Sequence, residues 1–255
     1  MTQNNVINQK MEKSDYIFGL RAIIEAIEAG KDIDKILVKK DINGDLAREL
    51  LAKAKEYGVL VRRVPVEKLN RITMKNHQGA VAVLAAVPYM RLENIVPTLY
   101  EEGRTPMMIV LDGVTDIRNF GAIARTACCA GANAVVIPSR NSVSITADAV
   151  KTSAGALFHI PVCRENTTLE AVRYLKLNGY KIVAATEKGA VDYTRIDYTV
   201  PVAIVMGAEE TGISSEVLIE ADDLAAIPMR GAISSLNVSV AAGVMIYEAV
   251  RQRNL

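Results

Sequence analysis

Residues 107–125, MMIVLDGVTDIRNFGAIAR, decide the fold of the larger part of this chain. The unbroken apolar run at 107–111 is typical of a parallel strand that is buried on both faces. A short polar turn follows, and apolar residues then recur at helical spacing, which predicts a helix over residues 122–130. A strand that leads directly into a helix is the repeating unit of doubly wound α/β sheets.

The same alternation continues toward the end of the chain. Further strands are predicted at residues 134–137, 181–185, 202–206 and 224–227, and further helices at 169–177 and 238–251. We therefore expect a doubly wound α/β domain, in which ligands bind at the carboxyl ends of the strands. The loops after Leu111, Ala185, Met206 and Ile227 are the places where a site is expected.

A smaller α/β unit is predicted before this domain. Its helices are expected at residues 20–27 and 46–54, and its strands at 36–38, 59–64 and 80–87. Prolines and a glycine then surround a short helix at 92–101, which favours a linker there. The predicted organisation is a flexible tail at 1–13, a small domain at 14–87, a linker at 88–105 and a larger domain at 106–255.

Composition excludes several classes of protein. The formal net charge of the 255 residues is +1, so contacts with nucleic acid must come from local basic patches. Cys128, Cys129 and Cys163 form no disulfide framework, and with two histidines we expect no metal site. No apolar run is long enough to span a membrane and no signal peptide begins the chain, so we expect a cytoplasmic protein. The glycine motifs of dinucleotide and nucleoside-triphosphate sites are absent, which disfavours a Rossmann-type metabolic enzyme.

The first candidate loop reads NFGAIAR at residues 119–125. Asn119 is expected near the cap of a helix, with Arg125 one turn inside. Gly121 shares a face with Arg125 and would let a ligand approach its guanidinium. The alternative is an ordinary solvated helix arginine.

The second candidate loop reads MGAEETGI at residues 206–213, directly after a buried strand. Gly207 would allow a ligand to lie against the backbone, and Glu209 would orient a cation or a hydroxyl group. An acidic surface turn is the alternative.

The third candidate segment is IPM at residues 227–229, followed by SSLN at 234–237. A helix with a clean apolar stripe comes next, so Ser234, Ser235 and Asn237 could simply cap it. One helix start does not need three polar residues, however, and the surplus groups favour contact with a ligand.

Together, the three loops resemble the SpoU/TrmH family of RNA ribose 2'-O-methyltransferases, within the SPOUT superfamily. The three family motifs resemble residues 112–125, 205–213, and 227–229 followed by 235–241, and SAGA at 153–156 also fits. In the first unit, residues 16–20 and 76–83 are similar to the L30e-like substrate-binding domain of the bacterial branch that methylates a guanosine in 23S ribosomal RNA.

The resemblance implies a trefoil-knotted parallel sheet, a homodimer, and S-adenosylmethionine bound among the knotted loops. Five residues would hold this cofactor by position: Gly207, Ile227, Leu236, Met229 and Thr186. Five residues would form the catalytic group: Arg125, Asn119, Glu209, Ser235 and Asn237.

Methyl transfer to a hydroxyl group needs an oxygen held on the methyl axis and a route for its proton. A guanidinium is effectively never a free base, so Arg125 is interpreted as a clamp on the adjacent phosphate and a stabiliser of the developing alkoxide. RNA phosphates would also contact basic residues of the first unit. The candidates are Lys39, Lys40, Arg62, Arg63, Lys68, Arg71 and Lys75.

Other targets and another class of function stay open from the sequence. The same fold could methylate a transfer RNA ribose, or an adenosine in ribosomal RNA as resistance enzymes do. The alternative from a different functional class is a non-catalytic RNA-binding assembly factor for the ribosome. Such a protein would be expected to have lost Asn119, Arg125 or residues 235–237. All of these residues are present.

Overall fold

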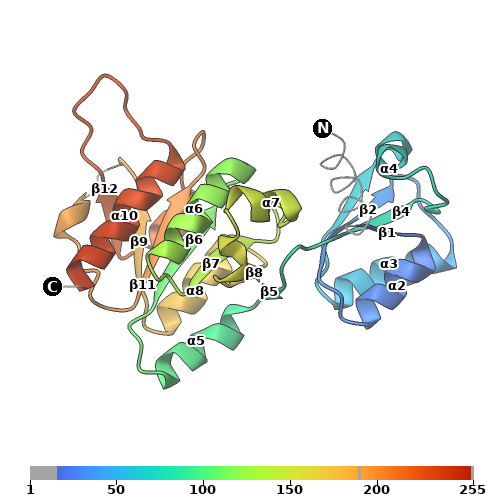
Figure 1. The fold of residues 1–255 in the computed structure, drawn as a ribbon, viewed down its shortest axis with the longest axis horizontal. Coiled ribbons are helices and arrows are strands. Elements are labelled where there is room, and N and C mark those ends of the chain that lie inside the picture. The colour runs from blue at the N-terminus through green and yellow to red at the C-terminus, as the bar shows by residue number, and fades with distance from the viewer. Residues whose placement is uncertain (1–15, 189–190, 254–255) are drawn as a thin grey trace, which may run out of the picture. The chain divides into compact units, whose positions relative to one another are not determined.

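The computed structural model describes residues 16–188 and 191–253, and the chain divides into two compact units (Figure 1). The first unit comprises the described residues up to Pro88 together with Ser144–Thr146, and the second comprises the remainder. The tail predicted at residues 1–13 lies outside the described residues.

The first unit is a small α/β layer structure, as its sequence pattern predicts. Its sheet has the order β1-β4-β2-β3, and only β2 and β3 pair in parallel. The strands are β1 (Tyr16–Phe18), β2 (Ile33–Lys39), β3 (Val61–Val64) and β4 (Ala80–Leu84). Helices α2 (Leu20–Glu28) and α3 (Asp45–Glu56) share one buried cluster with this sheet, while α4 (Val66–Ile72) contributes Leu69 to a second cluster.

The second unit contains an eight-stranded sheet in the order β10-β12-β9-β11-β6-β7-β8-β5, and every pairing in it is parallel. The strands are β5 (Tyr89–Met90), β6 (Met107–Asp112), β7 (Ala134–Pro138), β8 (Val162–Glu165), β9 (Lys181–Ala185), β10 (Val191–Asp192), β11 (Val202–Gly207) and β12 (Asp223–Ala226). The parallel α/β sheet is confirmed. The trefoil knot implied by the resemblance stays a prediction.

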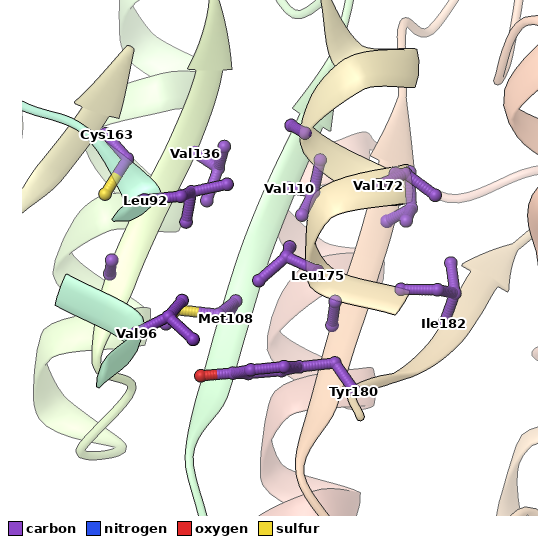
Figure 2. Close-up of a cluster of buried hydrophobic side chains, with 14 of the residues drawn as sticks. Leu92, Val96, Met108, Val110, Val136, Cys163, Val172, Leu175, Tyr180 and Ile182 are labelled. Atoms are coloured by element: carbon purple, nitrogen blue, oxygen red, sulfur yellow. The ribbon is translucent and has the colours of Figure 1, made fainter. Parts of the chain in front are cut away.

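Helices lie on both faces of this sheet (Figure 1). They are α5 (Leu92–Glu101), α6 (Ile117–Cys129), α7 (Ala147–Thr152), α8 (Thr168–Leu177), α9 (Ser215–Glu220) and α10 (Val238–Arg253). Figure 2 shows α5 and α8 packed on one face, where Val96 and Leu175 meet Met108 and Val110 of β6. Side chains alternate along each strand, so the other residues of β6 face the opposite side, which α6 and α10 cover.

The linker predicted at residues 88–105 differs from the structure. Most of this stretch belongs to the second unit, because α5 buries Leu92, Ile95, Val96 and Leu99 in the core of that unit. The carboxylate of Glu165 accepts a hydrogen bond from the Leu92 amide at 2.8 Å, which anchors the first turn of this helix. Proline and glycine composition marked the turns around α5, but its apolar face makes it a core helix.

Candidate active site

A cavity of about 530 Å³ lies at the carboxyl ends of β9, β11 and β12 and is closed on one side by the start of α10. Three of the four loops expected to carry a site contribute to its lining, namely those after Ala185, Met206 and Ile227. The loop after Leu111 lies beside it, because β6 pairs with β11 up to Asp112 and Gly207. These loops are neighbours because parallel strands end at a common edge of the sheet.

The residues predicted to hold a cofactor all line this one cavity. They are Thr186, Gly207, Ile227, Met229 and Leu236. Sequence reasoning missed further lining residues, among them Glu187, Lys188 and Glu210. Their position directly after a buried strand or inside the second motif was the signal that could have identified them.

Gly207 has a structural role different from the one its motif suggested. A Cβ atom at this position would lie 2.3 Å from the carbonyl carbon of Gly212 and 2.4 Å from the nitrogen of Ile213. The loop folds back on itself there, with the Gly212 amide donating to the Ala208 carbonyl at 2.8 Å. Glycine is therefore needed for this close approach of the chain, and the loop so formed becomes a wall of the cavity.

Asn237 connects the three motifs. Its side-chain nitrogen donates to Oδ1 of Asn119 at 2.9 Å and also to the carboxylate of Glu209. Its Oδ1 accepts from the backbone amides of Ser239 at 3.0 Å and Val240 at 3.4 Å, so Asn237 caps α10 as well. Asn237 therefore caps α10 and also lines the cavity, while its contact with a ligand stays a prediction.

Glu209 is held at the same helix start. Its Oε1 also accepts a hydrogen bond from the Val238 amide at 3.3 Å. A carboxylate is favoured at this position because the amides at the start of a helix carry partial positive charge. Ser235, the fifth predicted residue of the catalytic group, is exposed and lines the cavity.

Helix α6 begins earlier than the sequence pattern indicated. Its N-cap is Asp116, whose carboxylate accepts hydrogen bonds from the amides of Arg118 and Asn119 at 2.8 and 2.9 Å. Asn119 thus lies in the first turn, near the cap as expected, whereas Arg125 lies more than two turns in rather than one. At about 100° per residue, the side chains of Asn119 and Arg125 point about 120° apart.

Arg125 is exposed and does not line the cavity. Within the described residues it makes no hydrogen bond or ion pair. The expected role of Gly121 beside it is wrong: a Cβ there would lie 2.5 Å from Oγ1 of Thr152 and 2.7 Å from its carbonyl carbon. Gly121 therefore serves the packing of α7 against α6 and leaves no space for a ligand.

The candidate RNA-binding residues lie on several elements of the first unit. Lys40, Arg62, Arg63, Lys68, Arg71 and Lys75 are exposed, and Lys39 is half-buried. The guanidinium of Arg63 donates to the Lys40 carbonyl at 2.7 Å, which places the ends of β2 and β3 in contact.

A parallel α/β sheet with a cavity at its carboxyl edge, lined by glycine loops and carboxylates, is typical of α/β enzymes that bind a small molecule. Comparison with known families makes this specific. Residues 106–247 match the SpoU rRNA Methylase family, and residues 16–90 match the RNA 2'-O ribose methyltransferase substrate binding domain. The chain belongs to the SpoU/TrmH family of RNA methyltransferases, whose methyl donor is S-adenosylmethionine.

Individual relatives extend over nearly the whole chain. YacO of Bacillus subtilis (strain 168), whose name places it in the TrmH family of tRNA/rRNA methyltransferases, is 34% identical over 95% of this chain and 98% of its own length. The AdoMet-bound rRNA methyltransferase from Sinorhizobium meliloti has a TM-score of 0.60 and 31% identity, covering 93% of this chain and 87% of that one. AviRb from Streptomyces viridochromogenes, in complex with AdoMet, has a TM-score of 0.59 and 27% identity, covering 94% and 90%.

The described residues contain neither a membrane-spanning helix nor a cluster of metal-binding side chains. Across residues 16–188 and 191–253, no helix is long and apolar enough to cross a membrane. The same part of the chain holds no group of three or more histidine, cysteine, aspartate or glutamate side chains placed to bind a metal ion.

Proposed function

We propose that this protein methylates the ribose 2'-hydroxyl of a guanosine in 23S ribosomal RNA, as a cytoplasmic homodimer. The observation that carries the proposal is the bridge made by Asn237, which joins Asn119 and Glu209 at the edge of the cavity. Residues from all three motifs thus meet beside the space for a cofactor, as a transfer reaction between two bound molecules requires.

The residues around the cavity fit S-adenosylmethionine. A volume of about 530 Å³ is in the usual range for small-molecule sites. Met206, Ile227 and Leu236 offer apolar surface to an adenosyl group, while Glu187 and Glu209 offer carboxylates to a cationic ligand. When bound, the cofactor supplies an electrophilic methyl group. Thr186, Gly207, Ile227, Met229 and Leu236 would hold it.

The protein's part in the reaction is to orient the ribose and to stabilise charge. Asn237, itself bonded to Asn119, holds the Glu209 carboxylate in position. Ser235 lines the same cavity, where its hydroxyl would bind the ribose. Arg125 would clamp the adjacent phosphate and stabilise the developing alkoxide, while the proton leaves through phosphate or water.

Arg125 is best placed to act on the cavity of a second copy. Its side chain is exposed on α6 and absent from the lining of the cavity in its own chain. The neighbouring helix α10 exposes Val240 and Tyr247, which are 52% and 51% accessible and lie two turns apart on one side. Such an apolar strip suits a homodimer contact, and a symmetric dimer would bring each Arg125 toward its partner.

The choice of ribosomal RNA is supported by the family description, which names rRNA, and by the similar rRNA methyltransferase from Sinorhizobium meliloti. Transfer RNA is the alternative, since other relatives carry tRNA or both RNAs in their names. The test is mass-spectrometric mapping of ribose methylation in RNA from cells that lack this protein, beside complemented cells. Loss of one 2'-O-methylguanosine in 23S RNA is expected. Loss of a 2'-O-methyl group in transfer RNA would redirect the proposal, and no loss in either RNA would refute it.

A further inference from the structure

The loop between α4 and β4, residues 73–79, is fastened at both ends and exposed in the middle. Met74, Lys75 and Asn76 are exposed, and Met74 is 88% accessible, the highest value among the exposed large apolar side chains of the described residues. A single exposed apolar residue needs no explanation by itself. Met74 differs in that hydrogen bonds of His77 and Gln78 hold its loop in place.

His77 fastens the loop on one side. Its Nδ1 accepts a hydrogen bond from the Gly79 amide at 2.9 Å, and its Nε2 lies 2.9 Å from Oδ1 of Asn70 on α4. Because Nδ1 is an acceptor, Nε2 carries the proton and donates to Asn70. One side chain thus ties the loop to the helix before it and to the turn after it.

Gln78 fastens the loop on the other side. Its backbone has a φ of 51°, which is uncommon for a residue other than glycine, and its side-chain oxygen accepts from the Leu20 amide at 3.1 Å. The carbonyl of Gly79 then accepts a hydrogen bond from the Lys39 amide at 2.9 Å. Backbone strain of this kind persists where surrounding contacts hold it, and it gathers at functional positions.

Two lysine side chains lie at this loop: Lys75 belongs to it, and Lys39, whose Nζ is 3.8 Å from the Asp41 carboxylate, lies beside its end at Gly79. Lys75 lies over the Phe18 ring with its Nζ 5.5 Å from the ring centre. The carbon chain of Lys39 lies so close to Gly79 that a Cβ there would be 2.9 Å from it. The loop sequence TMKNHQG contains no acidic residue, so an anionic partner meets no repulsion from it.

We propose that residues 73–79 form the contact by which the first unit reads a folded RNA. Met74 packs against an unpaired base, Lys75 and Lys39 contact the flanking phosphates, and His77 positions the loop. The idea rests on the proposed function and names the surface that selects its substrate. A rigid loop loses little entropy on binding, and unpaired bases offer apolar faces that paired bases hide.

The test measures binding of the full chain to unmodified, transcribed 23S RNA and to unmodified transfer RNA, by fluorescence anisotropy. Met74→Asp is expected to raise the Kd for the preferred RNA at least about tenfold, since it replaces the proposed apolar contact with a base by a carboxylate that the RNA phosphates repel. Its matched control is Leu177→Asp, because Leu177 is 87% accessible and lies in the second unit. Lys75→Ala is expected to lower the salt dependence of binding by about one ionic contact, and Lys55→Ala to leave it unchanged.

His77 is tested as a positioning residue through the methylation kinetics. His77→Ala should raise the KM for RNA and leave kcat near its original value, with affinity for S-adenosylmethionine unaltered. Met74→Asp with an unchanged Kd overturns the loop proposal while the proposed function stands. A wild-type chain that binds RNA through this loop without methylating it refutes the proposed function alone, and a chain that binds neither RNA overturns both.

Discussion

The side-chain amide of Asn237 donates to Oδ1 of Asn119 at 2.9 Å, joining the start of α10 to the first turn of α6 across 118 positions of sequence. The same amide nitrogen donates to Glu209, while the oxygen of Asn237 caps α10. Asn237 therefore has two roles: its amide nitrogen bridges Asn119 and Glu209, and its amide oxygen caps α10. Because different atoms serve the two roles, a substitution can remove one and keep the other.

Asn237→Asp should preserve the cap and lose the bridge. The carboxylate still accepts from the amides of Ser239 and Val240, but it repels Glu209 and cannot donate to Asn119. We expect a Tm within a few degrees of wild type and a kcat lower by roughly 10- to 100-fold. Thermal melts and single-turnover methylation check this. Asn237→Ala is the control: it should lose the bridge and also about 1 kcal/mol of stability, because it removes the cap. Equal kcat values for wild type and Asn237→Asp would contradict the role of the bridge.

Arg125 and Glu209 should complement each other across a dimer. Arg125→Ala and Glu209→Gln chains are each expected to be inactive, whereas a refolded equal mixture should recover roughly a quarter of wild-type activity, because half the dimers then carry one intact site. Arg125→Lys, which keeps the charge and loses the bidentate fork, should remain impaired. A mixture that stays inactive would show that Arg125 acts within its own chain.

Gly207→Ala should abolish cofactor binding. The new Cβ would lie 2.3 Å from the backbone of Gly212, so the loop that walls the cavity must open. Gly231→Ala is the matched control, since nothing lies within 4 Å of a Cβ at that position. Calorimetry with S-adenosylmethionine should detect no binding for the first variant and wild-type affinity for the second. Equal affinities would disprove the packing argument.

Two glycines that lie on helices should respond to alanine in opposite directions. Gly121→Ala places a Cβ 2.5 Å from Oγ1 of Thr152 and should cost about 1–3 kcal/mol. Gly243→Ala meets only Cγ2 of Thr126, at 3.9 Å, and should stabilise α10 by about 0.5–1 kcal/mol. Chemical denaturation of the two variants measures both changes, and a shared sign would be inconsistent with the packing described.

The basic residues of the first unit should make RNA binding depend on salt. Replacing Arg62, Arg63, Lys68 and Arg71 by alanine is expected to reduce the slope of log K against log salt by about three. Anisotropy titrations at several salt concentrations measure this slope. An unchanged slope would mean that the four side chains stay solvated and do not contact RNA phosphates.

The sequence patterns predicted five of the eight strands of the second unit and missed β5, β8 and β10. The predicted strands were identified because runs such as residues 107–111 and 202–206 are buried on both faces. Short elements escaped them: β1 and β5 have three and two residues, too few to show a period. The start of α6 was also missed. Its cap, Asp116, is followed by Arg118 and Asn119, which interrupt the apolar spacing that marks the rest of the helix.

The members of the site were easier to predict from sequence than their relative orientation. Motif resemblance identified Gly207, Glu209 and Asn237, and parallel topology explains why they meet. The motif resemblance could not reveal that Thr152 fills the space beside Gly121, since that contact depends on how closely α7 approaches α6. Nor could the resemblance reveal where the Arg125 side chain points, which depends on the residue at which α6 begins.

Helix α10 is fixed at its far end too. The guanidinium of Arg253 donates to the carbonyls of Tyr198 at 2.9 Å and Val200 at 2.9 Å, as well as to the segment before β6. With Asn237 holding the other end, the helix cannot tilt without breaking hydrogen bonds at both. Because α10 is held at both ends, we expect any change in the shape of the cavity to come from the loop residues that line it, such as Met229 and Ser234, and not from the helix that closes one side.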